Sequence, residues 1–401
     1  MMKVGWQTEK LGDVCAFLNR GVSPKYLEQG GICVLNQKCI RDHRVSYEQS
    51  RRHDLAAKAV SAERLIQLGD VLVNSTGTGT LGRVAQVREV PAEPTTVDSH
   101  VTIVRPKPGK FFPDFFGYML VVIEEAIKEA GEGCGGQTEL ARSVLAEKFT
   151  VSYPTSVDEQ QRIVALLDQA FDGIAKARAN AEQNLQNARA LFESHLQSVF
   201  TQRGEGWKMK TLEEISTTFG RGKSKHRPRN DKKLYGGKYP FIQTGDIRNA
   251  EHFITEYSQT YSEVGLAQSK LWPKGTICIT IAANIAETAI LNFDACFPDS
   301  VIGVVTNPAE ADVDFVEYLL QSFKARIQAL GKGSAQANLN MGTFENERFP
   351  FPSITEQKKI VSKFDALREE TQRLAALYQR KLGALDELKQ SLLHQAFSGA
   401  L

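Results

Sequence analysis

The chain repeats itself over about 200 residues, and this internal repeat constrains the fold more than any other feature. When Trp6 is aligned with Trp207, the two halves match in order along most of their length. Further matched pairs are Leu11 with Leu212, Gly21 with Gly222, residues 34–37 with 241–244, Asp98 with Asp299, Asp114 with Asp314, Tyr118 with Tyr318, and Gln160 with Gln357. A chain of 401 residues built this way should contain two copies of one structural unit.

The first part of each copy is rich in short runs of β-branched residues bounded by glycine and proline. Such runs are typical of strands in a compact sheet. Four of them lie at residues 69–74, 100–104, 275–281 and 301–306. A helix is predicted after each set, over residues 114–130 and 314–330. The predicted fold class is α+β, with two tandem β-rich domains that are each followed by a long helix.

The second part of each copy predicts that long helix. Residues 156–202 and 355–397 contain no proline, and apolar residues recur there every three or four positions. A period near 3.5 favours a coiled coil, and about 40 helical residues form a rod of roughly 60 Å. We therefore expect the helices to pack on each other rather than each on its own domain alone. The residues predicted at this interface are Ile163, Leu167, Ile174, Leu191, Ile360, Phe364, Leu367, Leu374, Tyr378 and Leu388.

These patterns divide the chain into four predicted segments. They are a domain at residues 1–155, a helical spacer at 156–203, a second domain at 204–353 and a second spacer at 354–401.

The sequence carries no recognisable catalytic motif. Residues 222–224 resemble the end of a phosphate-binding loop, but Thr217 stands where its first glycine is required. The glycine pattern at residues 77–82 lacks the alternating strands and helices of a dinucleotide site. Residues 307–309 fail as an amino-methyltransferase motif at their third position, and no histidine forms a nucleophile motif. We predict a chain without catalysis of its own.

Composition narrows the class of protein further. The apolar fraction of 42% and the charged fraction of 24% are typical of globular domains. The sequence shows neither a signal peptide nor an apolar run of the roughly 18–20 residues that span a bilayer, so we expect a cytoplasmic protein. The six cysteines form no Cys-x-x-Cys pair and no zinc-ligand spacing with histidine, so no metal site is predicted.

Positive charge is concentrated in one segment, although the net charge is only +2. Between residues 221 and 233, Asp231 is the only acid among seven cations. Such a cluster can neutralise DNA phosphates, and an ordinary solvated loop is the alternative. The matching position in the first copy also holds cations. The predicted phosphate contacts are Arg20, Lys25, Arg221, Lys223, Lys225, Arg227 and Arg229.

Amide and hydroxyl side chains follow matched apolar runs in both copies. Gln and Asn can bind adenine through two hydrogen bonds, and Lys suits guanine, whereas capping of strand ends is the alternative role. The loops after the runs at 69–74 and 275–281 differ sharply, as expected of two copies that share a scaffold but read different sequences. Glycine loops at residues 133–138 and 333–338 could approach a backbone closely. The candidates are Gln37, Lys38, Asn74, Ser75, Thr76, Thr78, Gln137, Gln243, Thr244, Asn284, Gln336 and Asn338.

Taken together, the layout resembles the specificity subunit of type I restriction–modification enzymes over nearly the whole chain. The resemblance is carried by Trp6 and Trp207 at the start of each copy, and by residues 331–340, 352–361 and 391–399. The first copy matches more loosely at residues 136–140.

The resemblance implies two target-recognition domains that read a bipartite, gapped site in double-stranded DNA. Antiparallel packing of the two helices would set the gap. Two methyltransferase subunits would bring S-adenosylmethionine and flip the target adenine. Restriction subunits would use ATP and Mg for translocation and cleavage. This chain would bind no cofactor itself.

Two other classes of protein remain as rivals. A methyltransferase or nuclease with an unrecognised motif should bind S-adenosylmethionine or show metal-dependent activity. A coiled-coil scaffold whose ends bind proteins should show no salt-dependent affinity for DNA. The repeat with divergent polar loops favours reading of two DNA sites over both.

Overall fold

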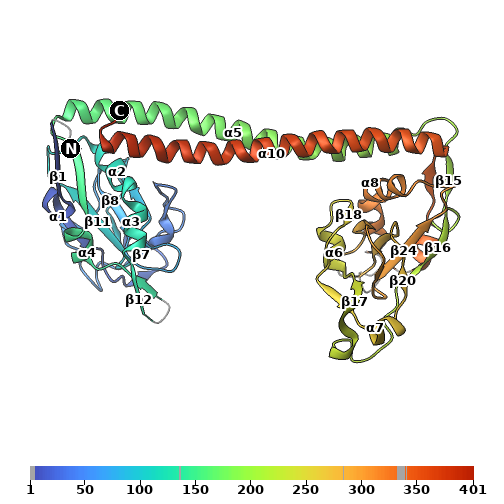
Figure 1. Ribbon diagram of the computed structural model, residues 1–401. Coiled ribbons are helices and arrows are strands. Elements are labelled where there is room, and N and C mark those ends of the chain that lie inside the picture. Colours follow the sequence, from blue (N-terminus) through green and yellow to red (C-terminus); the bar gives the residue numbers. More distant parts are fainter. Residues whose placement is uncertain (1–4, 135–136, 283, 332–338, 340) are drawn as a thin grey trace. The chain divides into compact units, whose positions relative to one another are not determined.

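The computed structural model describes residues 5–134, 137–282, 284–331, 339 and 341–401 (Figure 1). It divides into two units. Unit 1 comprises Met1–Ala181 with Lys381–Leu401, and unit 2 comprises Glu182–Arg380. Each unit holds the β-rich part of one copy and a portion of both long helices, α5 (Val157–Gln202) and α10 (Ile354–Ser398).

Unit 1 is built on two four-stranded sheets. The first has the order β2 (Cys15–Arg20), β11 (Val101–Pro106), β8 (Val71–Asn74) and β9 (Val84–Gln86). The second has the order β10 (Thr95–Val97), β4 (Ile32–Leu35), β7 (Arg51–His53) and β3 (Tyr26–Leu27). Two-stranded ladders pair β1 (Trp6–Lys10) with β14 (Thr150–Pro154), β5 (Ile40–Arg41) with β6 (Arg44–Val45), and β12 (Glu132–Cys134) with β13 (Gln137–Glu139). The short helices are α1 (Leu11–Val14), α2 (Pro113–Val122), α3 (Glu124–Glu129), α4 (Arg142–Glu147) and the 3-10 helices η1 (Gln37–Cys39) and η2 (Ala62–Arg64).

Unit 2 repeats this plan. Its first sheet has the order β16 (Ser216–Arg221), β24 (Val301–Thr306), β21 (Ile277–Thr280), β22 (Thr288–Leu291) and β18 (Phe253–Ile254). Its second has the order β19 (Gln259–Tyr261), β17 (Tyr235–Phe241), β23 (Ala295–Cys296) and β20 (Leu271–Trp272), and β15 (Lys208–Lys210) pairs with β25 (Phe349–Phe351). The helices are α6 (Thr244–Asn249), α7 (Glu263–Ala267), α8 (Val313–Gly331), α9 (Met341–Glu345) and the 3-10 helix η3 (Lys232–Leu234).

The four predicted strands and the α+β class are confirmed, as β8, β11, β21 and β24. The helix predicted over residues 314–330 is α8. The helix predicted over 114–130 is instead broken into α2 and α3 at Ile123, whose backbone has φ −94° and ψ 5°. The break follows the β-branched run Val121 to Ile123, and such residues lose side-chain freedom in a helix.

Both units bury their helices against the first sheet. In unit 1, Phe115 of α2 joins one apolar cluster with Leu167 of α5 and Phe397 of α10. In unit 2, Phe315 of α8 joins a cluster with Phe200 of α5 and Phe364 of α10. Each cluster therefore ties one domain to a portion of both long helices. Among the described helices, none is both long and apolar enough to cross a membrane.

One matched glycine pair shows why the two copies share a backbone. A Cβ atom on Gly21 would lie 1.9 Å from the carbonyl oxygen of Val97, and one on Gly222 would lie 2.3 Å from that of Phe297. Only glycine lets the segment after β2 or β16 approach the backbone of these residues so closely. The repeat in sequence is thus a repeat in packing.

Candidate nucleic-acid interface

In unit 1, the structure brings the predicted loop around Gln37 against the loop that follows β8. The Thr80 hydroxyl donates to Gln37 Oε1 at 2.8 Å, and Asn74 Nδ2 donates to the Gln37 carbonyl oxygen at 3.0 Å. Lys38 beside them is exposed, and its backbone N–H is capped by the Asn36 side chain at 2.8 Å. The two loops thus form one continuous polar surface.

Arg20 extends this surface to the hairpin formed by β12 and β13. Its guanidinium lies 2.7 Å from Glu139 and donates to the Leu140 carbonyl oxygen at 2.8 Å. Thr76 forms an antiparallel bridge with Glu139, and its hydroxyl lies 2.6 Å from His100 Nδ1. Arg20 is therefore engaged within the domain, and Thr76 connects the loop after β8 to the hairpin. Lys25 and Thr78 are exposed.

Two candidates of this loop are buried, contrary to the expectation that they contact DNA. Asn74 is 0% exposed and Ser75 is 1% exposed. The Ser75 hydroxyl lies 2.5 Å from that of Thr102, and Asn74 donates to the backbone of the Gln37 loop. Consecutive side chains of a strand point to opposite faces, and here both faces are covered, so both side chains form bonds inside the domain.

In unit 2, all five predicted cations of the basic segment are exposed, namely Arg221, Lys223, Lys225, Arg227 and Arg229. Arg221 donates to the Asp299 carbonyl oxygen at 2.7 Å, and Arg229 lies 3.0 Å from both carboxylate oxygens of Asp299. Arg227 donates to the Ser224 carbonyl oxygen at 2.7 Å. These arginines hold the loop in shape. No ion pair to Lys223 or Lys225 occurs among the residues that the structure describes.

One cation of this region was missed in the sequence. Lys270 Nζ lies 3.5 Å from the centre of the Trp272 ring. The neighbouring Ser269 hydroxyl donates to the Lys223 carbonyl oxygen at 2.9 Å, which joins the two segments. Partial burial, and then the charge of Lys223, lower the pKa of Lys270. A bound anion would offset the repulsion between the positive charges of Lys223 and Lys270.

In unit 2, the loop that contains Gln243 and Thr244 lies beside the loop that follows β21 and contains Asn284. Gln243 precedes α6, which begins at Thr244, and Gln243 Nε2 donates to Gln259 Oε1 at 2.9 Å. Arg248 of α6 donates to Asn284 Oδ1 at 3.4 Å. The matched loops of unit 1 are joined in the same way by Gln37 and Thr80. Gln336 and Asn338 lie outside the described residues, as does the side chain of Gln137.

Eight of the ten residues predicted at the helix interface are buried or half-buried. The prediction is wrong for Leu191 and Leu388, which are 50% and 47% exposed. After Ala188 the apolar stripe of α5 continues by four residues to Phe192, which packs on Phe364 of α10 with ring centres 6.2 Å apart. In α10 the position four residues after Leu385 is Lys389, and this side chain faces α5, because its Nζ lies 5.4 Å from the centre of the Phe171 ring.

A matched tyrosine anchors each domain to a long helix. The Tyr118 hydroxyl donates to Asp168 of α5, and the Tyr318 hydroxyl donates to Asp365 of α10 at 2.6 Å. Burial, together with the bond to Asp168, raises the pKa of Tyr118 to about 12. These tyrosines therefore act as neutral donors at any ordinary pH.

A basic side chain stands between the matched aspartate and tyrosine of each unit. In unit 2 this is His252, which stacks on Tyr318 and lies 2.9 Å from Asp314 and 2.6 Å from Glu317. Burial alone would lower the pKa of His252, but the two carboxylates outweigh it and raise the pKa. In unit 1, Arg88 lies over the Tyr118 ring and 3.8 Å from Asp114.

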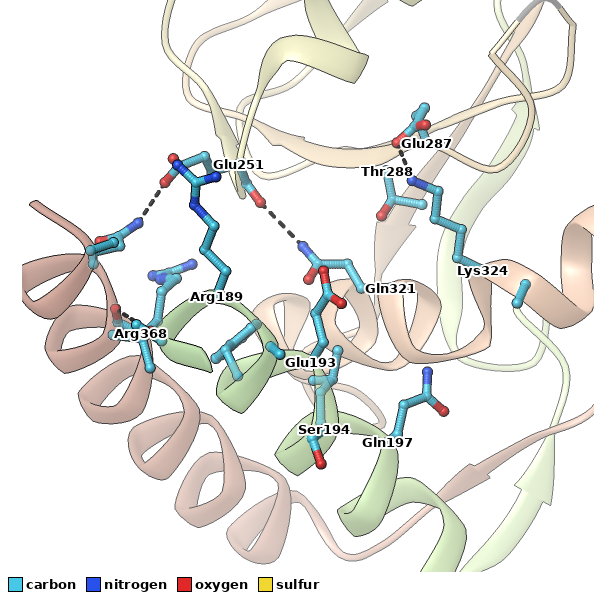
Figure 2. A pocket seen from close by; sticks show the side chains of 18 of the residues that line it. Arg189, Glu193, Ser194, Gln197, Glu251, Glu287, Thr288, Gln321, Lys324 and Arg368 are labelled. Carbon is cyan, nitrogen blue, oxygen red and sulfur yellow. Dashed lines mark hydrogen bonds and ion pairs between the residues drawn. The ribbon is translucent and has the colours of Figure 1, made fainter. Parts of the chain in front are cut away.

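A groove of 1340 Å³ lies in unit 2 where α5, α8 and α10 meet (Figure 2). Figure 2 shows Lys324 paired with Glu287, and Gln321 bonded to the backbone of Glu251. Unit 1 has a groove of 770 Å³ between α2, α5 and α10. The repeat matches residues that line the two grooves, namely Phe192 with Lys389, Leu196 with Leu393, and Gln321 with Val121. Each unit thus carries an equivalent groove beside its helices.

Comparison with known proteins gives a consistent result. A family model described as the type I restriction modification DNA specificity domain matches residues 3–183 and again residues 204–379. A protein of Methanocaldococcus jannaschii assigned as the type I restriction enzyme MjaX specificity subunit is 21% identical, over 99% of this chain and 93% of that protein. The type I restriction enzyme StySPI specificity subunit of Salmonella potsdam is 22% identical, over 49% of this chain and 44% of that protein.

Two solved structures share the fold. A chain from a study of complex assembly and conformational transition of the type I R-M system aligns with a TM-score of 0.81 at 18% identity, over 100% of both chains. The HsdS subunit from Thermoanaerobacter tengcongensis aligns with a TM-score of 0.67 at 18% identity, over 100% of this chain and 98% of that one.

Proposed function

Since the chain belongs to the family of type I restriction modification DNA specificity domains, we propose that it reads a bipartite, gapped target in double-stranded DNA, one part with each unit. Its role is DNA recognition and not catalysis. The observation that carries the proposal is the repeat itself, in which equal scaffolds present unequal polar loops. The loop after β8 holds Thr76 and Thr78, whereas the loop after β21 holds Asn284.

The contacts would divide between positioning and reading. Lys223 and Lys225 are exposed cations suited to DNA phosphates, Arg227 is exposed but also donates to the Ser224 carbonyl oxygen, and Lys25 and Lys38 would serve unit 1. Gln37, Thr78, Gln243, Thr244 and Asn284 would lie near base edges. Arg20, Arg221 and Arg229 are engaged by acidic residues or carbonyl oxygens and would contribute to phosphate binding mainly by shaping the loops.

The helices would separate the two reading surfaces. In unit 1 Leu167, near the start of α5, shares an apolar cluster with Phe397 at the end of α10, and in unit 2 Phe200, near the end of α5, shares one with Phe364 near the start of α10. These contacts support an antiparallel coiled coil. At 1.5 Å per residue the 46 residues of α5 extend over about 69 Å. In this arrangement the domains are residues 1–155 and 204–353, and the spacers are residues 156–203 and 354–401.

Two copies of one partner would bind such a chain, because the repeat gives each unit an equivalent groove beside its helices. We propose that these partners are methyltransferase subunits that carry S-adenosylmethionine, and that restriction subunits using ATP and Mg join them. The substrate, cellular DNA, would place the assembly in the cytoplasm.

Selection from a library of randomised duplexes by the full-length chain tests the proposal. We expect enrichment of two short conserved blocks separated by a gap of fixed length. Recovery of sequences without any shared block would overturn the reading function.

A further inference from the structure

Strand register places one residue of each unit at the same point of the repeat. In unit 1, β7 pairs antiparallel with β4, and Arg51 lies opposite Val34. In unit 2, β19 pairs antiparallel with β17, and Gln259 lies opposite Phe241. Val34 and Phe241 are matched by the sequence repeat, so Arg51 and Gln259 occupy equivalent positions. The sequence alone did not single out either residue.

The surroundings of Arg51 leave its side-chain donors available. Its guanidinium carbon lies 4.3 Å from the centre of the Tyr26 ring, and both side chains are exposed. No hydrogen bond or ion pair to the Arg51 side chain occurs among the described residues. A guanidinium stacked on a ring keeps its in-plane N–H groups free at the edge, and the stacking limits its orientations.

Arg51 also lines a groove of 440 Å³ with the predicted recognition loop, including Gln37 and Lys38. Asn36 of that loop is already engaged. Its Oδ1 accepts from Lys38 N at 2.8 Å, and its Nδ2 donates to the Gln49 carbonyl oxygen at 2.6 Å. Arg51 therefore adds to this groove a guanidinium whose donors have no protein partner among the described residues.

In unit 2, Gln259 likewise lies beside a predicted recognition loop, the one that contains Gln243 and Thr244. It is exposed, and its Oε1 accepts from Gln243 Nε2 at 2.9 Å. A carboxamide oxygen has a second lone pair, and the Nε2 group of Gln259 carries two N–H donors. Held by Gln243, this carboxamide can still offer one acceptor and one donor side by side.

We propose that Arg51 and Gln259 are base-reading residues, with Arg51 directed to a guanine and Gln259 to an adenine. Arginine suits the O6 and N7 acceptors of guanine, whereas glutamine suits N6 and N7 of adenine. Arg51 and Gln259 thus occupy equivalent positions, on β7 paired with β4 and on β19 paired with β17, and the two units differ there only in the side chain. This inference rests on the proposed function and adds to it the bases that each half of the target should contain.

The duplex selection with the full-length chain tests the inference. Arg51→Gln should relax one guanine position in one block by about 5- to 150-fold and leave the other block unchanged. Arg51→Lys should keep part of the guanine preference. Gln259→Arg should convert one adenine position in the other block toward guanine.

Matched controls remove or add the same charge elsewhere. Lys107→Gln in unit 1 and Gln202→Arg at the end of α5 change exposed residues outside the proposed surface and should leave both blocks intact. If the wild-type chain enriches two blocks and Arg51→Gln and Gln259→Arg leave them unchanged, the inference is wrong although the proposed function stands. Equal weakening at all sequences would make Arg51 a phosphate contact and overturn its reading role. A wild-type chain that enriches nothing would count against the proposed function itself.

Discussion

Gln357 repeats in unit 2 the contacts that Gln160 makes in unit 1. Each side chain is fully buried at the start of a long helix. Gln160 Oε1 accepts from Phe112 N at 2.8 Å, and its Nε2 donates to the Pro154 carbonyl oxygen at 2.9 Å. Gln357 makes the same pair of bonds with Asp312 N at 2.9 Å and the Pro352 carbonyl oxygen at 3.0 Å. One carboxamide therefore fastens each helix start to its domain.

Replacement of this carboxamide should loosen the helix start. Gln357→Leu leaves the Asp312 N–H and the Pro352 carbonyl oxygen without these partners, which should lower the free energy of unfolding by about 2–4 kcal/mol. Urea unfolding of the full chain measures the change. Lys358→Ala, which alters an exposed neighbour, is the control and should leave the unfolding curve in place.

The exposed lysines of unit 2 should contribute to DNA affinity without selecting sequence. Lys223→Gln with Lys225→Gln should weaken binding to all duplexes alike and reduce the slope of log affinity against log salt by about 0.9 for each phosphate that the chain no longer neutralises. Titrations at several salt concentrations check this, with Lys274→Gln as a control. An effect at a single base position would instead make these lysines base readers.

The buried His252 should make the stability of unit 2 depend on pH. Its pKa is raised in the folded chain by Asp314 and Glu317 despite burial, so folding favours the protonated form. This stabilisation is fully present below the ordinary pKa of 6.5 and is lost as pH rises through the raised value.

Unfolding measured across this pH range should show that loss in the wild-type chain. His252→Gln should remove this pH dependence and, by leaving the buried Glu317 without its cation, cost about 3 kcal/mol below the ordinary pKa. His394→Gln, at an exposed site, is the control. An unchanged pH profile in His252→Gln would contradict the account.

Two leucines of α5, Leu185 and Leu191, test which face of this helix is buried. Leu185 is 9% exposed, whereas Leu191 is 50% exposed. Leu185→Ala should destabilise the chain by about 2–4 kcal/mol, and Leu191→Ala should change stability by no more than about 0.5 kcal/mol. Thermal unfolding of both variants distinguishes them, and equal losses would restore Leu191 to the interface.

Most of the architecture was predictable because the repeat and the helical period are long-range patterns. The same reasoning failed at Leu191 and Leu388, since a strict heptad steps by three where these stripes step by four. Asn74 and Ser75 were misplaced because polarity alone does not tell which way a strand end faces. Arg51 and Gln259 were missed because pairing between strands depends on register, which no local pattern contains.

The central claim is that the chain reads two separated half-sites, and adenine-methylation mapping tests it most directly. DNA from cells that express this chain with its methyltransferase subunit would be compared with DNA from cells that lack this chain. We predict a two-part motif with a fixed gap that disappears without the chain. A continuous motif would contradict reading at two half-sites, and methylation that does not change without the chain would contradict its role in recognition.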